Sequence, residues 1–453
     1  MTRTILRGAH IVTMNADFDE FVGDLVVENG RIAALVRSGV RAEVARERPG
    51  DREIDCRGRT LIPGLVQTHL HLCQTLFRSL ADDLRLEQWL KERIWKFEGA
   101  LTAETMRVSA DIGLCELSTS GTTTLLDMGT VHHTDAVGEA VDYSGLRAFI
   151  GKAMMDEGDD IPASLRETTA ESVRESLALA DRWHGAAGGR IEYAFCPRFA
   201  LSCSTSLLRQ VGEICASEGY VMHTHSNETE WEVQEVGRRW QDTNIGYLHS
   251  VGLLGPRAVL AHGVHFVDDE RAILRDTRSC VTHCPSSNLK LASGIADIPL
   301  LWKWGVRVGL GADGAPCNNT MDGFQEMRLA AMIQKPIYGP TAMPARRVLQ
   351  LATRDGADVL GLSHEVGSLE VGKSADLVLL DLQQPHHGID GEAADALGGS
   401  VYARIVYAAR PSDVRSVFAG GEEIARDGVS LKYDTAELHA RGRDALTQIL
   451  SRR

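Results

Sequence analysis

The stretch LIPGLVQTHLHL, residues 61–72, marks the point where the sequence changes from short strand patterns to alternating strand and helix patterns. From Leu65 to about residue 360, β-rich runs alternate with segments of helical periodicity such as SLLRQVGEICASEG and DERAILRDT. The eight β-rich runs are LVQTHLH (65–71), TTTLLDM (122–128), RAFIGKAMM (147–155), IEYAFCPRF (191–199), YVMHTHS (220–226), AVLAHGVH (258–265), CVTHCPSS (280–287) and VRVGLGAD (306–313). Eight strand–helix alternations over about 250 residues predict an α/β fold, a closed (β/α)₈ barrel of the TIM type.

Both ends of the chain have the pattern of short strands instead. ILRGAHIVTM and FVGDLVVENGRIAALV lie near the start, with Asn29-Gly30 as a hairpin signal. GSLEVGKSADLVLLDL and SDVRSVFAGGEEIARDG resemble hairpins near the end, and ELHARGRDALTQILSRR is expected to be a terminal helix. The sequence therefore predicts a small β-sandwich domain made of residues 1–62 plus 365–453, including the terminal helix, and a barrel domain of residues 63–364.

Composition and charge exclude several classes of protein. The 453 residues are 43% hydrophobic and 24% charged, with a net charge of −14, so a general nucleic-acid binder, which needs a basic face, is not expected. No apolar stretch reaches the ~18 residues that span a bilayer, and no signal peptide is visible at the start. The nine cysteines are scattered and form no CxxC pair. We therefore expect a cytoplasmic protein with reduced thiols and no membrane association.

Polar residues end several of the predicted barrel strands, where catalytic groups of such barrels lie. His69 and His71 end the first strand and point to the same side, because side chains alternate along a strand. HTHSNE ends the fifth strand, AHG the sixth, and GADG the eighth. Each residue alone is most often a satisfied core residue, but a set of histidines and carboxylates at one barrel end favours a metal site.

Three neutral imidazole nitrogens and one carboxylate suit a single divalent metal ion, Zn²⁺ above all, although Fe²⁺ accepts the same ligands. Such an ion lowers the pKa of a bound water to about 7. One carboxylate can then take the proton of that water, and a second can protonate a ring nitrogen beside the attacked carbon. This chemistry expels ammonia from an amino-substituted ring.

The pattern PG-(x)₄-HxH, a later His followed by xxE, a further His and a late strand-end Asp resembles the amidohydrolase superfamily over essentially the whole chain. The branch it resembles contains mononuclear-metal deaminases and chlorohydrolases. The resemblance implies that the metal ligands are His69, His71, His225 and Asp313, with Asp313 also acting as a base. It further implies that Glu228 shuttles a proton to the ring nitrogen and that His262 contacts the metal-bound water. His223 is expected to be an interior histidine or one that supports a ligand.

Several further stretches are similar to deaminases of 5′-deoxyadenosine, 5′-methylthioadenosine or S-adenosylhomocysteine. They are HLCQTLFRSLADDLRLEQWLKERIWKFE, SSNLKLASGIADIPLL and GADGAPCNN. In that group a glutamate 27 residues after the HxH motif holds the ribose hydroxyls, which implies this role for Glu98; a helix-terminal surface glutamate is the alternative. Of the two arginines that hold homocysteine in that group, one aligns with Lys152 and the other falls near Ser164. This departure favours a substrate with a smaller 5′ group.

Other stretches are similar to guanine deaminases. PRFALSCS and Gln74 carry this resemblance, which implies that Arg198 contacts a carbonyl of the base and Gln74 its far edge. His283, in CVTHCPSSN, is expected to be an interior histidine or a substrate contact.

The preferred function is therefore deamination of an adenosine-type nucleoside, with a small purine-like molecule as the partner. The assembly of the chain into a homo-oligomer stays open. Three alternative functions also stay open: a deaminase of guanine or another free aminopurine or pterin, an s-triazine amino- or chlorohydrolase, and an inactive barrel with a structural or interaction role. The last is disfavoured because the six residues that the resemblance assigns to ligand and proton-carrier roles are all present.

Overall fold

The structure is a computed structural model that describes residues 3–40, 42–158, 160–389 and 399–452. The chain folds into two compact units. Their segments are Met1–Val66, Glu116–Thr124 and Asp322–Lys432 in the first, and Gln67–Cys115, Leu125–Met321 and Tyr433–Arg453 in the second. None of the described helices is both long enough and apolar enough to cross a membrane.

A closed parallel barrel of eight strands confirms the predicted fold class. Its strands are β6 (Leu65–His71), β7 (Thr122–Asp127), β8 (Arg147–Ile150) with β9 (Ala153–Met154), β10 (Ile191–Pro197), β11 (Val221–Ser226), β12 (Ala258–His262), β13 (Cys280–His283) and β14 (Arg307–Leu310) with β15 (Asp313–Gly314). They follow one another in the order β11-β12-β13-β14-β6-β7-β8-β10, and pairing of β10 with β11 closes the ring. Strands β6, β7, β12 and β13 are buried along their whole length, as expected of strands covered on both faces.

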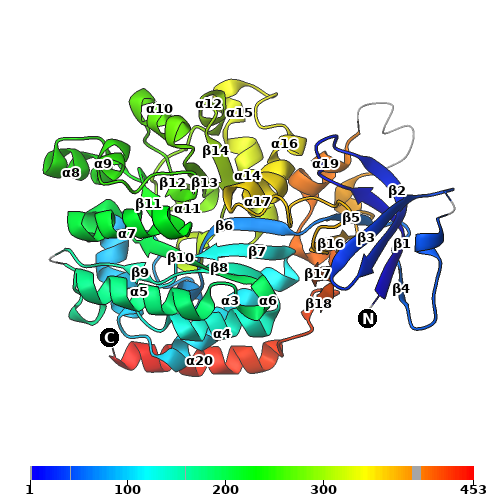
Figure 1. The fold of residues 1–453 in the computed structure, drawn as a ribbon, viewed down its shortest axis with the longest axis horizontal. Coiled ribbons are helices and arrows are strands. Elements are labelled where there is room, and N and C mark those ends of the chain that lie inside the picture. Colours follow the sequence, from blue (N-terminus) through cyan, green and yellow to red (C-terminus); the bar gives the residue numbers. More distant parts are fainter. Residues whose placement is uncertain (1–2, 41, 159, 390–398, 453) are drawn as a thin grey trace. The chain divides into compact units, whose positions relative to one another are not determined.

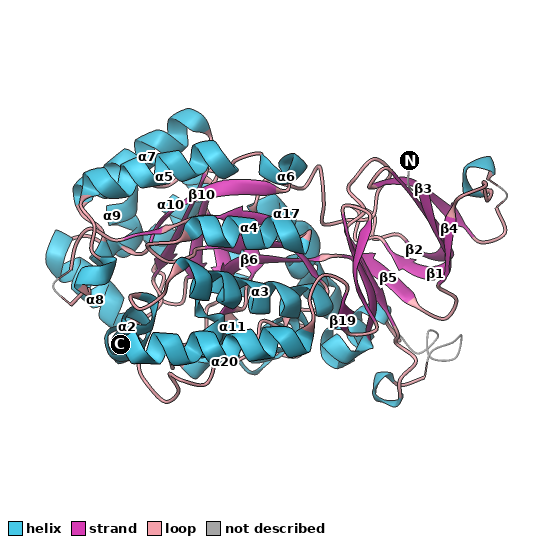
Figure 2. Cartoon of the chain, turned by 90° about the horizontal axis from the view of Figure 1, so that it is seen from below, coloured by secondary structure: helices cyan, strands magenta, loops and turns pink. Residues whose placement is uncertain are grey.

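Helices follow the barrel strands and lie on their outer side (Figure 2). They include α3 (Ala103–Thr119), α4 (Thr134–Ser144), α5 (Thr169–Trp183), α7 (Thr205–Glu218), α8 (Glu230–Trp240) and α10 (Asp268–Thr277). Local sequence signals set their ends: the Ser204 hydroxyl caps α7, and Gly219 ends it in the left-handed conformation. The predicted terminal helix is α20 (Thr435–Arg452), which contacts α3 through an ion pair of Arg441 with Asp111 at 3.1 Å.

A second, mixed sheet joins the two ends of the chain, shown by the blue and orange strands of Figure 1. Its strands are β1 (Arg3–Val12), β2 (Glu20–Glu28), β3 (Arg31–Arg37), β4 (Arg52–Asp55), β5 (Thr60–Pro63), β16 (Leu377–Leu380), β17 (Val414–Ala419), β18 (Glu422–Arg426) and β19 (Val429–Ser430). β5 pairs with β1 on one side and with β16 on the other. One apolar core, with Leu6, Leu25, Leu377 and Phe418 among its members, contains residues from both ends. The boundaries at residues 62 and 365 stay a prediction.

Of the hairpins predicted for this sheet, one differs. Asn29 and Gly30 both have positive φ (52° and 79°) and join β2 to β3 as expected. In GSLEVGKSADLVLLDL, however, only β16 is a strand, and it pairs with β5 and β17. Gly367 and Gly372 (φ 89° and 94°) bend the first half of the segment into turns, so that half forms no strand.

Candidate functional site

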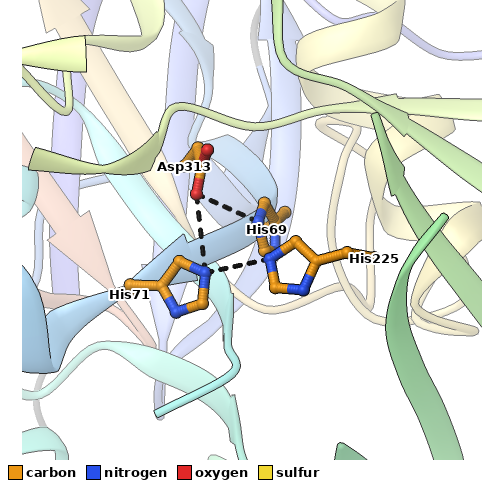
Figure 3. Close-up of side chains that lie close together, drawn as sticks. All are labelled: His69, His71, His225 and Asp313. Atoms are coloured by element: carbon orange, nitrogen blue, oxygen red, sulfur yellow. Dashed lines mark hydrogen bonds and ion pairs between the residues drawn. The ribbon is translucent and has the colours of Figure 1, made fainter. Parts of the chain in front are cut away.

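Three histidines and one aspartate converge at the carboxyl ends of three barrel strands (Figure 3). His69 and His71 come from β6, His225 from β11 and Asp313 from β15. Asp313 Oδ1 lies 3.1 Å from His69 Nε2 and 3.5 Å from His71 Nε2, and the Nε2 atoms of His71 and His225 are 3.1 Å apart. One potential ligand atom from each of the four residues lies within 4.8 Å of the others.

This cluster fits a divalent metal ion. Ligand atoms about 2.0–2.2 Å from a tetrahedral ion lie about 3.4 Å from one another, close to the separations of 3.1–3.5 Å found here. Burial and the neighbouring His69 hold the pKa of His71 and of His225 well below the usual range. Both imidazoles are therefore neutral and keep a lone pair for a metal.

Asp313 is held in place by its neighbours. Its backbone adopts a left-handed conformation (φ 61°), which is uncommon outside glycine, and the nearby His262 does so too (φ 76°). The Ser287 hydroxyl donates to Asp313 Oδ2 at 2.6 Å, and the Cys317 thiol donates to the same oxygen at 3.1 Å. Left-handed backbone at non-glycine residues is characteristic of functional sites.

Glu228 and His262 lie next to the cluster. His262 Nε2 is 3.6 Å from Glu228 Oε2 and 4.0 Å from Asp313 Oδ2, while its Nδ1 hydrogen-bonds Asn288 Oδ1 at 2.9 Å. Burial raises the pKa of Glu228 to about 7. The Glu232 side chain fixes the turn that carries Glu228, since it accepts a hydrogen bond of 2.8 Å from the Glu228 backbone N–H. A carboxyl group with a pKa near neutrality can both give and take a proton.

A buried polar network connects three of the predicted substrate residues. Arg198 donates to both carboxylate oxygens of Glu98, at 2.8 and 3.2 Å. Gln74 Nε2 donates to Glu98 Oε1 and the Thr130 hydroxyl to Glu98 Oε2, each at 2.8 Å. These four hydrogen bonds occupy the acceptor positions of the Glu98 carboxylate. A contact of Glu98 with ribose therefore requires one of these partners to be exchanged when substrate binds.

We expect Glu98→Gln to lower the free energy of unfolding by about 3–5 kcal/mol, because the buried Arg198 guanidinium loses its carboxylate partner. Urea denaturation followed by circular dichroism measures this loss. Glu104→Gln, at an exposed site on α3, is the matched control and should leave the midpoint unchanged. An unchanged stability of Glu98→Gln would show that the ion pair contributes nothing to folding.

Lys152 and His283 belong neither to the hydrogen-bond network of Glu98 nor to the four-residue cluster. Lys152 is fully buried; its ammonium pairs with the Glu167 carboxylate and lies 3.3 Å from Glu175 Oε2. His283 is also fully buried, and neither ring nitrogen has a hydrogen-bond partner among the described residues. Burial lowers its pKa to about 3. Neither side chain lines the pocket at the cluster, so their roles as substrate contacts stay predictions.

A small pocket with a cavity volume of about 30 Å³ lies beside the cluster. Its polar lining includes Arg198, Glu228 and His262 together with ligand residues of the cluster. Its apolar lining comprises Leu86, Trp89, Leu90, Phe199, Trp231 and Leu291. The two tryptophans were not predicted from the sequence. The sequence feature that could have indicated them is their closeness to predicted site residues. Trp89 lies in LEQWLKERIWKFE, which ends at Glu98, and Trp231 follows HSNETE, which contains Glu228.

A barrel with a buried histidine–aspartate cluster at its strand ends is typical of metal-dependent hydrolases. A profile of the amidohydrolase family matches residues 60–424, and the chain belongs to this family. A 5-methylthioadenosine/S-adenosylhomocysteine deaminase of Moorella thermoacetica is 40% identical over 391 residues, which cover 86% of this chain and 87% of the relative. A 5′-deoxyadenosine deaminase of Methanobrevibacter smithii is 35% identical over 98% of both chains.

Solved structures agree with this assignment. An adenosine deaminase of Xanthomonas campestris with bound zinc has a TM-score of 0.89 and 28% identity over 99% of both chains. The guanine deaminase of E. coli has a TM-score of 0.82 and 26% identity, covering 94% of this chain and all of that one. A triazine hydrolase (TM-score 0.88, 22% identity, 98% of this chain and 100% of that one) shares the fold.

Proposed function

We propose that this protein is a hydrolytic deaminase of adenosine-type nucleosides. The cluster of His69, His71, His225 and Asp313, opening with Glu228 onto one pocket, carries this proposal. Relatives that are 34–40% identical over 86–100% of this chain are named as deaminases of 5′-deoxyadenosine, 5′-methylthioadenosine or S-adenosylhomocysteine. Because Lys152 is paired with an internal carboxylate, substrates with a small neutral 5′ group are the preferred members of this set.

The ion that we propose for the four ligands is Zn²⁺, and Fe²⁺ accepts the same donor set. When bound, the ion supplies a water that is nucleophilic at neutral pH. Histidines kept neutral by burial and a carboxylate held by Ser287 and Cys317 are the chain's contribution to this ion.

The chain's acid and base groups complete the reaction. The Asp313 carboxylate takes a proton from the attacking water, and Glu228 gives a proton to the ring nitrogen beside the attacked carbon. His262, 3.6 Å from Glu228 and hydrogen-bonded to Asn288, orients the water. A carbon–oxygen bond forms and the exocyclic carbon–nitrogen bond breaks. The amino group leaves as ammonia with the proton that Asp313 had taken, and the proton of the new hydroxyl group returns to Glu228.

The Arg198 network supports a second candidate, deamination of guanine or another free oxo-purine. A guanidinium has five N–H donors, and the ion pair with Glu98 uses two of them. Because Arg198 lines the pocket, the remaining donors are suited to a carbonyl oxygen of a base. In this arrangement Glu98 holds Arg198 and does not contact a ribose.

A substrate panel separates the two candidates. We expect ammonia release by the zinc-loaded protein to be fastest with 5′-deoxyadenosine or 5′-methylthioadenosine, and slower with S-adenosylhomocysteine, adenosine, adenine, guanine, and a chloro- and an amino-triazine. The measurement is kcat/KM for each compound, with the same protein treated with a chelator as the control. If guanine gives the highest value, Arg198 and Gln74 define the specificity and the nucleoside proposal is wrong.

A further inference from the structure

His223 lies between the metal-ligand cluster and the barrel wall. It is on β11, two residues before His225, and its side chain is fully buried. Its Nε2 atom is 2.7 Å from His69 Nδ1, and its Nδ1 atom is 2.9 Å from the backbone oxygen of Val259 on β12. The imidazole therefore connects the backbone of one barrel strand to the ring of His69.

The chemistry of these three groups fixes the positions of the protons. A backbone carbonyl is only an acceptor, so His223 Nδ1 must carry the proton that bonds Val259. Full burial favours a neutral imidazole, which leaves His223 Nε2 without a proton. His223 Nε2 is then the acceptor at 2.7 Å, and His69 Nδ1 is the donor. With its proton on Nδ1, His69 directs the unprotonated Nε2 into the cluster, where a bound metal ion would accept its lone pair.

We propose that His223 is a positioning residue that fixes the tautomer and orientation of the metal ligand His69 through this Val259–His223–His69 chain. The proposal rests on the metal site of the proposed function. His225 is fixed in the same way by a single step, since its Nδ1 lies 2.7 Å from the backbone oxygen of Arg198. His71 differs, because its Nδ1 has no hydrogen-bond partner in the part of the chain that the structure describes.

Zinc affinity tests this role without any measurement of activity. We expect His223→Phe to weaken Zn²⁺ binding about 10–100-fold, the usual effect of losing a group that supports a metal ligand. His223→Gln keeps an acceptor for His69 and a donor for Val259, and is expected to bind Zn²⁺ within several-fold of the wild type. Competition of the metal-free proteins with a chromophoric chelator gives the Zn²⁺ affinities. His249→Gln, at an exposed position, is the control.

Several results would overturn the proposal. The proposal is wrong if His223→Phe binds Zn²⁺ as tightly as the wild type, or if the Phe and Gln variants lose equal Zn²⁺ affinity. It is also wrong if the wild type binds no zinc, a result that would contradict the proposed function as well. A wild type that binds zinc but deaminates none of the panel contradicts only the proposed function. If His223→Phe does not fold, the zinc-loaded wild type provides the test. Long-range ¹H–¹⁵N correlation spectra should place the His223 proton on Nδ1. A proton on Nε2 would exclude the Val259–His223–His69 hydrogen-bond chain.

Discussion

Glu228→Gln is expected to lower the turnover number at least about 100-fold while the metal stays bound, because the amide keeps the shape of the side chain but cannot transfer its proton. Glu228 is buried, lies 3.6 Å from His262 Nε2, and has a pKa that burial raises to about 7. It lines the pocket but does not belong to the four-residue cluster. Loss of its proton should therefore slow the chemical step and leave metal binding unchanged.

The experiment combines steady-state ammonia release with metal content measured by mass spectrometry on the same preparation. Glu235→Gln is the matched control, because this carboxylate lies on α8 near Glu228 but bonds the exposed Arg238 at 2.8 Å. Wild-type turnover in Glu228→Gln would remove Glu228 from the mechanism. Loss of metal together with turnover would show that Glu228 supports the ion instead of shuttling a proton.

Asp313→Ala is expected to lose both the metal ion and activity, with turnover falling on the order of 10³-fold or more, because we propose Asp313 as both a ligand and the base. Asp313 Oδ1 faces His69 and His71 at 3.1 and 3.5 Å, so its removal leaves three nitrogens without the single negative charge of the set. Metal content after dialysis and ammonia release measure the two losses. Added Zn²⁺ should not restore turnover.

Asp276→Ala is the control for this variant, since Asp276 is exposed on α10 and pairs with the adjacent Arg275 at 2.7 Å. It should keep the metal content and turnover of the wild type. Full metal occupancy in Asp313→Ala would contradict the assignment of Asp313 as a ligand. Retained turnover with full occupancy would also exclude it as the base.

The placement of the cluster could be predicted from the sequence because it depends on local rules. The period of two along a strand places His69 and His71 on one side of β6, and the ends of parallel strands in a closed barrel converge. His225 and Asp313 each lie near the end of a short β-rich run, so the same rule applies to them. The eight runs themselves were recognisable because they are rich in β-branched and apolar residues and alternate with segments of helical periodicity.

The partners of the predicted substrate residues could not be inferred from the sequence, because they come from other elements. Lys152 pairs with Glu167 across a loop, and Glu98 pairs with Arg198, a residue 100 positions away. The sequence gives the spacing of residues along one element but not the side chain that meets them from another. For the same reason the direction of Trp89 and Trp231 into the pocket depends on packing that no local pattern encodes.

The sheet that joins both ends of the chain has a consequence for synthesis on the ribosome. Strand β5 ends at Pro63, whereas its neighbour β16 begins at Leu377, so roughly 310 residues must be translated before the two can pair. At about 5–20 residues per second this takes about 15–60 s. Throughout that interval the growing chain carries an unpaired strand edge and only the N-terminal part of an apolar core, which are the features that expose a nascent chain to aggregation. Because of this strand order, the sheet can be completed only near the end of translation.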